Sequence, residues 1–254
     1  MGILIITVMI TLHILADFYL QTEKIARNKV LSFKGVSVHS LQYGIVYALA
    51  FIFVRFNPLL LLCFILAVIA HFLVDSLKYW MSNRSEFKGF FGKPALIFLA
   101  DQLLHIVSLL LIVLLYEKAG PQEPLLYLYG IWSELLGVLN LKPAFAISWL
   151  LLILLILKPA NITFGVFFST FKPEEEAKRD EKQQKTGAII GSLERILIVF
   201  FISINQYSAL GFILTAKSIA RYDAIAKDRM FAEYYLIGTL VSVVFSVAAY
   251  TLVF

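Results

Sequence analysis

Imidazole and carboxylate side chains recur at a spacing of four residues in the first part of this 254-residue chain. Three of its four histidines have an aspartate four positions away, within segments that are otherwise almost wholly apolar. Residues four apart lie on one face of a helix, and ionisable groups are costly inside apolar helices, so the pattern indicates a functional site. The pairs are His13 with Asp17, His71 with Asp75, and His105 with Asp101, and the fourth histidine is His39.

These residue types predict a divalent metal site. Imidazole together with carboxylate suits zinc, manganese or iron, and zinc is the ion we favour. The set exceeds one tetrahedral shell, so it allows two ions, or one ion whose ligands are oriented by further carboxylates. The residues alone leave open that each pair is a hydrogen-bonded contact that holds two helices together. The expected metal ligands are His13, Asp17, His39, His71, Asp75, Asp101 and His105.

The elements that must position these groups are membrane-spanning helices. The chain is 60% hydrophobic and only 15% charged, with a mean hydropathy of +0.85. Its apolar residues form long continuous runs, which favour an all-α polytopic transmembrane bundle over a barrel of alternating strands. The partner is therefore a lipid bilayer. The net charge of +5 does not indicate nucleic acid, because the cations cluster in short loops between spans. The single cysteine, Cys63, excludes a zinc-thiolate site.

The apolar runs predict eight spans, and loop charge predicts their orientation. Three to five Lys and Arg residues lie in each of the loops 21–36, 79–93, 161–186 and 221–232, whereas the intervening loops carry two at most. The positive-inside rule then places these four loops in the cytoplasm and both termini outside, in a multi-pass protein of the cell inner (plasma) membrane. The first span reads as a retained helix, not a cleaved signal. The expected spans are 2–20, 37–56, 58–78, 94–116, 143–160, 187–204, 206–220 and 233–254.

This orientation brings the ionisable groups of the first four spans to one level of the membrane. Most of them fall within about 15 Å of the cytoplasmic boundary, at 1.5 Å of rise per residue. We therefore expect a His/Asp-bearing half at 1–120, an intermediate region at 121–186 and a three-helix half at 187–254. Within the intermediate region, 125–140 is expected to lie along the membrane interface, and 172–185 to form a charged linker.

Several strings resemble an uncharacterised bacterial integral-membrane family, domain of unknown function 3307. In the first half they are HILADFYLQ (13–21), VHS (38–40), HFLVDSLK (71–78) and DQLLH (101–105). In the second half they are GAIIGSLERIL (187–197), GFILTAKSIAR (211–221) and EYYLIGTLVS (233–242).

A looser resemblance concerns the inner-membrane metal-dependent hydrolases of the LexA-regulated type. The strings HSL at 39–41 and HFLVD at 71–75 are similar to motifs of that group. The resemblance implies that His39, His71 and Asp75 are metal ligands and that the chain hydrolyses an ester.

Together these observations predict a metal-dependent hydrolase that acts on a lipid-linked or membrane-associated (phospho)ester at the cytoplasmic leaflet. A metal-bound hydroxide would be the nucleophile. The alternatives are a metal-ion or proton-coupled transporter, a bis-histidine haem protein, and a membrane scaffold or sensor without enzymatic activity. The expected catalytic residues are Asp17, His39 and Lys78, and the expected substrate-binding residues are Lys78, Arg195, Lys217 and Arg221, although ion pairing at helix ends also explains the last three.

Overall fold

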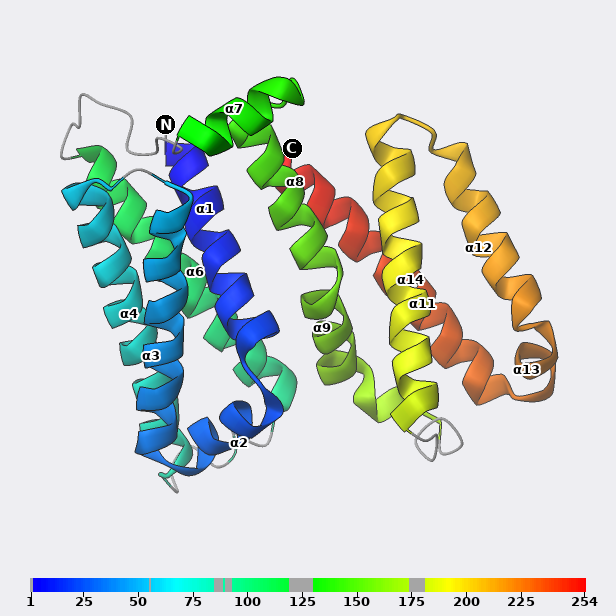
Figure 1. Cartoon of the computed structure of the whole chain (residues 1–254). Coiled ribbons are helices and arrows are strands. Elements are labelled where there is room, and N and C mark those ends of the chain that lie inside the picture. The colour runs from blue at the N-terminus through cyan, green and yellow to red at the C-terminus, as the bar shows by residue number, and fades with distance from the viewer. Residues whose placement is uncertain (1, 55, 85–88, 90–92, 119–129, 174–180) are drawn as a thin grey trace. The chain divides into compact units, whose positions relative to one another are not determined.

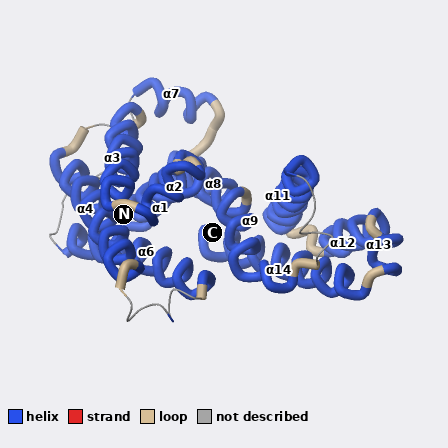
Figure 2. Tube along the Cα trace, turned by 90° about the horizontal axis from the view of Figure 1, so that it is seen from below, coloured by secondary structure: helices blue, strands red, loops and turns tan. Residues whose placement is uncertain are grey.

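A computed structural model describes residues 2–54, 56–84, 89, 93–118, 130–173 and 181–254. This part of the chain is built from helices joined by short loops, which confirms the all-α prediction (Figure 1, Figure 2). The chain forms two compact units, residues 1–151 and residues 152–254. The expected His/Asp-bearing half falls within the range of unit 1, and the expected three-helix half within unit 2.

Unit 1 is built around four long helices that pack side by side. Helix α4 packs against α3 and α6, and α1 packs against α6 and, less extensively, α3. Their shared core includes Met9, Tyr47, Leu60 and Leu109, which are almost completely buried. The elements are α1 (Gly2–Ile14), η1 (Leu15–Leu20), α2 (Glu23–Leu31), α3 (Phe33–Leu49), η2 (Ala50–Ile52), α4 (Pro58–Ser82), α6 (Pro94–Lys118), α7 (Gly130–Val138) and the start of α8 (Pro143–Ile156).

Helix α2 corrects the expectation of a simple loop at 21–36. The side chains of Thr22 and Ser32 accept hydrogen bonds from backbone N–H groups at the starts of α2 and α3, as helix N-caps do. The turn between the two helices is tight. A Cβ at Gly35 would lie 2.7 Å from the backbone nitrogen of Lys29 and nearer still to the carbonyl oxygen of Asn28. Glycine is therefore required where α3 passes α2.

Unit 2 contains a broken helix, and its other helices pack around α11 and α14. Helix α8 ends at Ile156, and Leu157 departs from helical geometry with φ −88° and ψ −96°. Pro159 follows directly, and its missing N–H removes a hydrogen bond from the helix ladder at this point. The elements after the break are α9 (Lys158–Phe168), η4 (Ser169–Phe171), α11 (Glu181–Ser203), α12 (Ser208–Ala220), α13 (Tyr222–Lys227) and α14 (Arg229–Val253).

Seven helical segments are long and apolar enough to cross a membrane, so the chain has the character of a polytopic membrane protein. The eighth expected span, 206–220, coincides with α12, which has 13 residues. At 1.5 Å per residue α12 is about 20 Å long, shorter than a hydrocarbon core of about 30 Å. The count of eight and the orientation of the termini therefore remain predictions. The seven segments are 3–20, 33–52, 58–82, 94–118, 143–171, 186–203 and 229–253.

Two expected segments lie partly outside the described residues. Of the interfacial segment 125–140, residues 125–129 are outside, and α7 accounts for most of the remainder. Of the charged linker 172–185, residues 174–180 are outside, and α11 already begins at Glu181. Because α11 starts six residues before the expected span at 187, Glu194 and Arg195 lie in the middle of this helix, not in its first turns.

Candidate metal centre

The seven expected ligands meet inside unit 1. They come from α1, η1, α3, α4 and α6, and each is at most 9% exposed. The spacing of four residues placed the members of each pair on one face, and the packing of α1, α3, α4 and α6 turns these faces toward one another. The ligands by element are His13 on α1, Asp17 on η1, His39 on α3, His71 and Asp75 on α4, and Asp101 and His105 on α6.

Four ligand atoms form the first group, which we call the tetrad: Oδ1 of Asp17, Nε2 of His39, Nε2 of His71 and Oδ2 of Asp75. His39 Nε2 lies 2.8 Å from the Asp17 oxygen, 3.1 Å from His71 Nε2 and 3.7 Å from the Asp75 oxygen. His71 Nε2 lies 3.5 Å from the Asp17 oxygen and 3.4 Å from the Asp75 oxygen. A tetrahedral zinc ion with ligands at 2.0–2.1 Å has ligand–ligand distances of about 3.3 Å. Five of the six ligand–ligand distances of the tetrad are therefore close to those of a zinc shell.

A second group shares Asp75 with the tetrad. Nε2 of His105 lies 3.7 Å from Oδ1 of Asp75 and 3.8 Å from Oδ1 of Asp101. The two oxygens of Asp75 thus face different groups, Oδ2 toward His39 and His71 and Oδ1 toward His105. Three sets of residues meet the spacing expected of metal ligands: His39, His71 and Asp75 of the tetrad, then Asp75, Asp101 and His105, and also His13, Asp17 and His71. A carboxylate in this position is able to bridge two ions.

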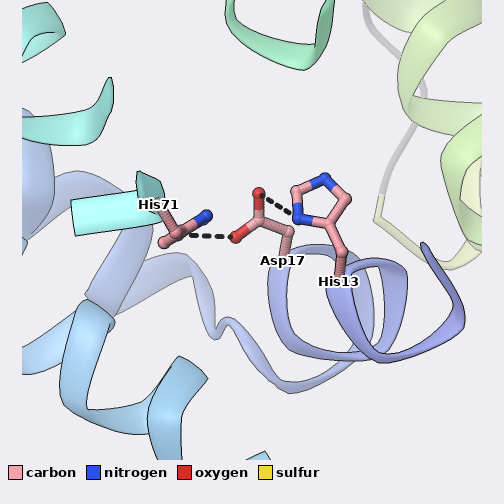
Figure 3. A group of neighbouring side chains, drawn as sticks. All are labelled: His13, Asp17 and His71. Carbon is pink, nitrogen blue, oxygen red and sulfur yellow. Dashed lines mark ion pairs between the residues drawn. The ribbon is translucent and has the colours of Figure 1, made fainter. Parts of the chain in front are cut away.

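His13 approaches the tetrad through Asp17. Figure 3 shows the Asp17 carboxylate between the rings of His13 and His71. Oδ2 of Asp17 is 3.9 Å from Nδ1 of His13, and Oδ1 is 3.5 Å from Nε2 of His71. The shortest contact of Asp17 is nevertheless with His39 on another helix. The four-residue pairs therefore identified the correct helix faces, but the closest partners come from different helices.

Many polar atoms of these groups have no hydrogen-bond partner among the described residues. They include both oxygens of Asp75, Oδ1 of Asp101 and both ring nitrogens of His105, all buried. An unpaired buried polar group costs about 1–3 kcal/mol, so native proteins satisfy nearly all of them with protein, water or an ion. A bound cation would satisfy several of these oxygen and nitrogen atoms simultaneously, as is usual for the ligands of a metal site.

Two lysines border the site and neutralise part of its charge. Nζ of Lys29 on α2 lies 3.0 Å from Oδ2 of Asp75, and Nζ of Lys78 on α4 lies 2.9 Å from Oδ2 of Asp101. Burial lowers the pKa of Lys29, but the charges of Asp17, Asp75 and Asp101 outweigh it and raise the pKa above its ordinary value of 10.5. Lys29 is therefore a cation of the site that the sequence analysis missed.

A tyrosine pair on α3 orients the histidines. The ring of Tyr43 stacks on that of His71, with centroids 3.8 Å apart and planes 10° from parallel. Tyr47 donates its O–H to the carbonyl oxygen of Met9 at 2.8 Å. The Tyr43 hydroxyl lies 3.1 Å from the Tyr47 hydroxyl and 3.3 Å from Nδ1 of His13. On its other side, Nε2 of His13 lies 3.4 Å from Oε1 of Gln102, so polar contacts at both ring nitrogens orient His13.

The backbone around Asp17 is also unusual. Residues Leu15–Leu20 form a π-helical turn, closed by a hydrogen bond of 3.1 Å from the N–H of Gln21 to the carbonyl oxygen of Ala16. A π-helical turn is wider than an α-helical turn and is frequent at functional sites. Here it follows His13 directly and holds Asp17 toward α3, where His39 lies.

The remaining expected substrate-binding residues lie in unit 2. Arg195 is buried at the break between α8 and α9, where it donates to the carbonyl oxygens of Ile156 and Leu157 and to the side chain of Asn161. Nζ of Lys217 lies 2.6 Å from Oε2 of Glu194. Arg221, Arg195 and Lys217 line one cavity of unit 2.

The fold and the buried groups define a class: an all-helical polytopic membrane protein with an intramembrane His/Asp cluster. The family is visible over residues 4–128, which match the family described as "Protein of unknown function (DUF3307)". The chain resembles that family over this region, which contains all seven expected ligands, as the first-half motifs indicated. No curated protein and no solved structure matches the chain. The looser likeness to LexA-regulated hydrolases stays a prediction.

Proposed function

We propose that unit 1 binds a divalent metal ion, zinc by preference, in the tetrad of Asp17, His39, His71 and Asp75. The observation that carries the proposal is the set of five distances between these ligand atoms, 2.8–3.7 Å, because a tetrahedral zinc shell has edges of about 3.3 Å. Manganese and iron accept the same ligand types and are the alternatives. A second ion would bind at the other oxygen of Asp75.

We further propose that this centre hydrolyses a lipid-linked or membrane-associated ester, with a phosphoester as the best match. The shared carboxylate of Asp75 supports this function, because two ions about 3.5–4 Å apart stabilise both the attacking and the leaving oxygen of a displacement. A bound ion would supply hydroxide at neutral pH. Lys78, whose side chain is 28% exposed, would bind an anionic oxygen of the substrate at the more accessible edge of the site.

In this assignment Asp17 and His39 act as ligands, which is one of the two roles expected for them. In such a hydrolysis the ester bond would break, water would supply the hydroxyl group that replaces the leaving oxygen, and the proton lost by that water would pass to the leaving oxygen. The hydrolysis is assigned to the cytoplasmic leaflet of the inner membrane by loop charge alone.

A metal-ion carrier is the second candidate, and the depth of burial favours it. The side chains of His39, His71 and Asp75 are at most 1% exposed. Buried ionisable groups within membrane helices also mark ion pathways. The same ligands would then bind the ion transiently during transport, and no ester substrate would need to reach them.

The metal content of the purified full chain tests the site. In lipid nanodiscs, after zinc loading and removal of excess ion, we expect one or two zinc equivalents per chain by mass spectrometry of the elements. Asp75→Asn should lose most of this zinc, because both groups use Asp75. Asp223→Asn, on the exposed helix α13, is the matched control and should retain it. Wild-type protein that retains no metal would overturn the proposal.

Activity and flux measurements separate the two candidate functions. The zinc-loaded chain is given lipid phosphomonoesters, lipid phosphodiesters and carboxylic esters, and product release is compared with that of Asp75→Asn. The hydrolase predicts turnover that disappears with the variant and with chelation. Zinc uptake into proteoliposomes, lost in Asp75→Asn and without ester cleavage by the wild type, would establish the carrier instead.

A further inference from the structure

Unit 2 contains a cavity of about 520 Å³ whose lining residues all belong to unit 2. This volume lies within the range of about 300–1,000 Å³ that is usual for small-molecule sites. The cavity lies between α9, α11, α12 and α14. Its lining residues lie near the ends of α9 and α12 and in the first halves of α11 and α14. These parts of the four helices lie toward the same side in Figure 1. Two of these helices, α11 and α14, contain segments that are long and apolar enough to span a membrane.

The charged side chains that line the cavity have an excess of positive charge. Four of them are cations and one, Glu194, is an anion. Glu194 pairs with Lys217 at 2.6 Å. Lys172 follows η4, and Arg221 follows α12. Neither of these two cavity-lining side chains has an ion pair with any residue that the structure describes. The cavity therefore attracts an anion, and Lys172 and Arg221 are the groups available to bind it.

The rest of the wall is apolar and aromatic. It is formed by Phe164, Ile190, Phe231, Tyr234 and Tyr235. The ring of Tyr235 also lies 5.1 Å from Nζ of Lys217, so the aromatic wall begins next to the charged groups. Cations on one part of a wall and aromatic rings on the next match a ligand with an anionic group joined to an apolar chain.

Two glycines keep part of the cavity open. A Cβ added at Gly165 on α9, or at Gly187 on α11, would meet no atom within 4 Å. Glycine inside a helix is less favourable than alanine by about 1 kcal/mol. Larger side chains at these positions would therefore enter open space without a collision, and they provide a way to fill the cavity without disrupting the packing.

We propose that unit 2 binds a phosphate-bearing amphiphile in this cavity, with the phosphate at Lys172 and Arg221 and the apolar chain along Phe164 and Tyr235. A phosphate suits the site better than a carboxylate, because its several oxygens engage a guanidinium and an ammonium at the same time. The proposal does not depend on the metal centre, since unit 1 contributes no lining residue.

The test measures binding of a short-chain phosphatidic acid to the full chain in phosphatidylcholine nanodiscs. EDTA is present so that no metal-dependent reaction consumes the ligand. We expect one bound molecule per chain. Arg221→Gln should weaken binding about tenfold or more, because it removes a charge-assisted hydrogen bond to the phosphate. Gly165→Leu should weaken it by occupying the cavity, and Asp75→Asn should leave it unchanged.

Matched controls separate the cavity from general effects on charge and folding. Lys227→Gln removes a cation from the exposed surface of α13, and Gly211→Leu fills open space beside a helical glycine that does not line the cavity. Both should bind like the wild type. Equal binding by the Arg221 and Lys227 variants would overturn the proposal. So would displacement by inorganic phosphate at the same concentration as the lipid, because the apolar wall would then contribute nothing.

Discussion

Both units bury charged side chains inside helices, but they satisfy them differently. In unit 2 the Arg195 guanidinium donates to two carbonyl oxygens, to Asn161 and to Ser192, and Glu194 has Lys217 as its partner. In unit 1 the oxygens of Asp75 lack hydrogen bonds to any described residue, although Lys29 lies beside one of them. Burial of a charge is common to both regions, so burial alone does not identify a site. A site is identified instead by buried polar atoms whose capacity to donate or accept hydrogen bonds is unused.

The difference follows from what each region has to compensate. The break at Leu157 and the proline after it free backbone carbonyls in the middle of an apolar segment, where water is absent. Arg195 donates to the carbonyl oxygens of Ile156 and Leu157, of which the second also accepts from the N–H of Asn161, and this is a structural role. Nothing in the backbone of α4 or α6 requires an aspartate, since both are regular helices of 25 residues. The carboxylates of unit 1 therefore need another explanation, and the proposed metal ion would provide one.

The largest expected effect is a difference in zinc content between variants of the two ligand groups of unit 1. Asp75→Asn should remove most of the bound zinc, whereas Asp101→Asn should remove only the ion held beside His105 and leave the tetrad loaded. The measurement is zinc stoichiometry per chain at saturating ion. Identical losses in the two variants would show that the groups do not bind separate ions.

The next largest effect is expected at Arg195, the buried charge of unit 2 whose hydrogen bonds are satisfied. Arg195→Met should destabilise the protein by about 1–3 kcal/mol for each carbonyl left without a donor, while its zinc content stays at the wild-type value. Thermal unfolding in detergent measures the loss. Arg229→Met is the control, because Arg229 is largely exposed and pairs only with Glu233 at the surface. Reduced zinc in Arg195→Met, with unchanged stability, would reverse the comparison between the units.

A smaller effect is expected at Lys29. Its ammonium group lies 3.0 Å from the Asp75 oxygen of the tetrad, so it repels an incoming cation. Lys29→Gln should therefore strengthen zinc binding several-fold in a competition assay with a chelator of known affinity. Lys24→Gln, on the exposed side of the same helix, should have no effect. Weaker binding in Lys29→Gln would mean that Lys29 positions Asp75 more than it opposes the ion.

The smallest effect is a pH dependence. The pKa of Lys29 is raised above 10.5, so its pair with Asp75 contributes fully below the unfolded value and is lost only as pH rises through the folded value. The stability difference between wild type and Lys29→Met should therefore be constant from pH 7 to about pH 10 and then shrink. Unfolding of metal-free protein across this range provides the measurement, and a difference that already falls near pH 8 would contradict the raised pKa.

The sequence predicted the helical class, and it identified seven residues that the structure brings together in unit 1, because both depend on local patterns. Apolar runs mark spans, and a spacing of four residues marks a helix face. The sequence was a poor guide to which side chains contact one another. Asp17 pairs most closely with His39, 22 positions away, which no local spacing encodes. Tyr43 and Tyr47 follow His39 at the same spacing of four, and this signal was available in the sequence but was obscured by the apolar surroundings.

Helix α2 shows a second limit. The segment 23–31 is polar and rich in lysine and arginine, so its charge was read only as a sign of membrane orientation. The caps at Thr22 and Ser32 were the better signal, since each precedes a helix. Lys29 became part of the site only because α2 packs back against α3 and α4, which is a tertiary effect.

The close passage of Gly35 beside α2 has a consequence for how this site can vary among related sequences. A methyl group at position 35 would force Asn28 and Lys29 away from α3, and the ammonium group would then no longer reach Asp75. Glycine at 35 and lysine at 29 should therefore be inherited together. Relatives with a larger residue at the first position should have lost the lysine at the second, and an alignment in which the two vary independently would show that α2 has another way to reach the site.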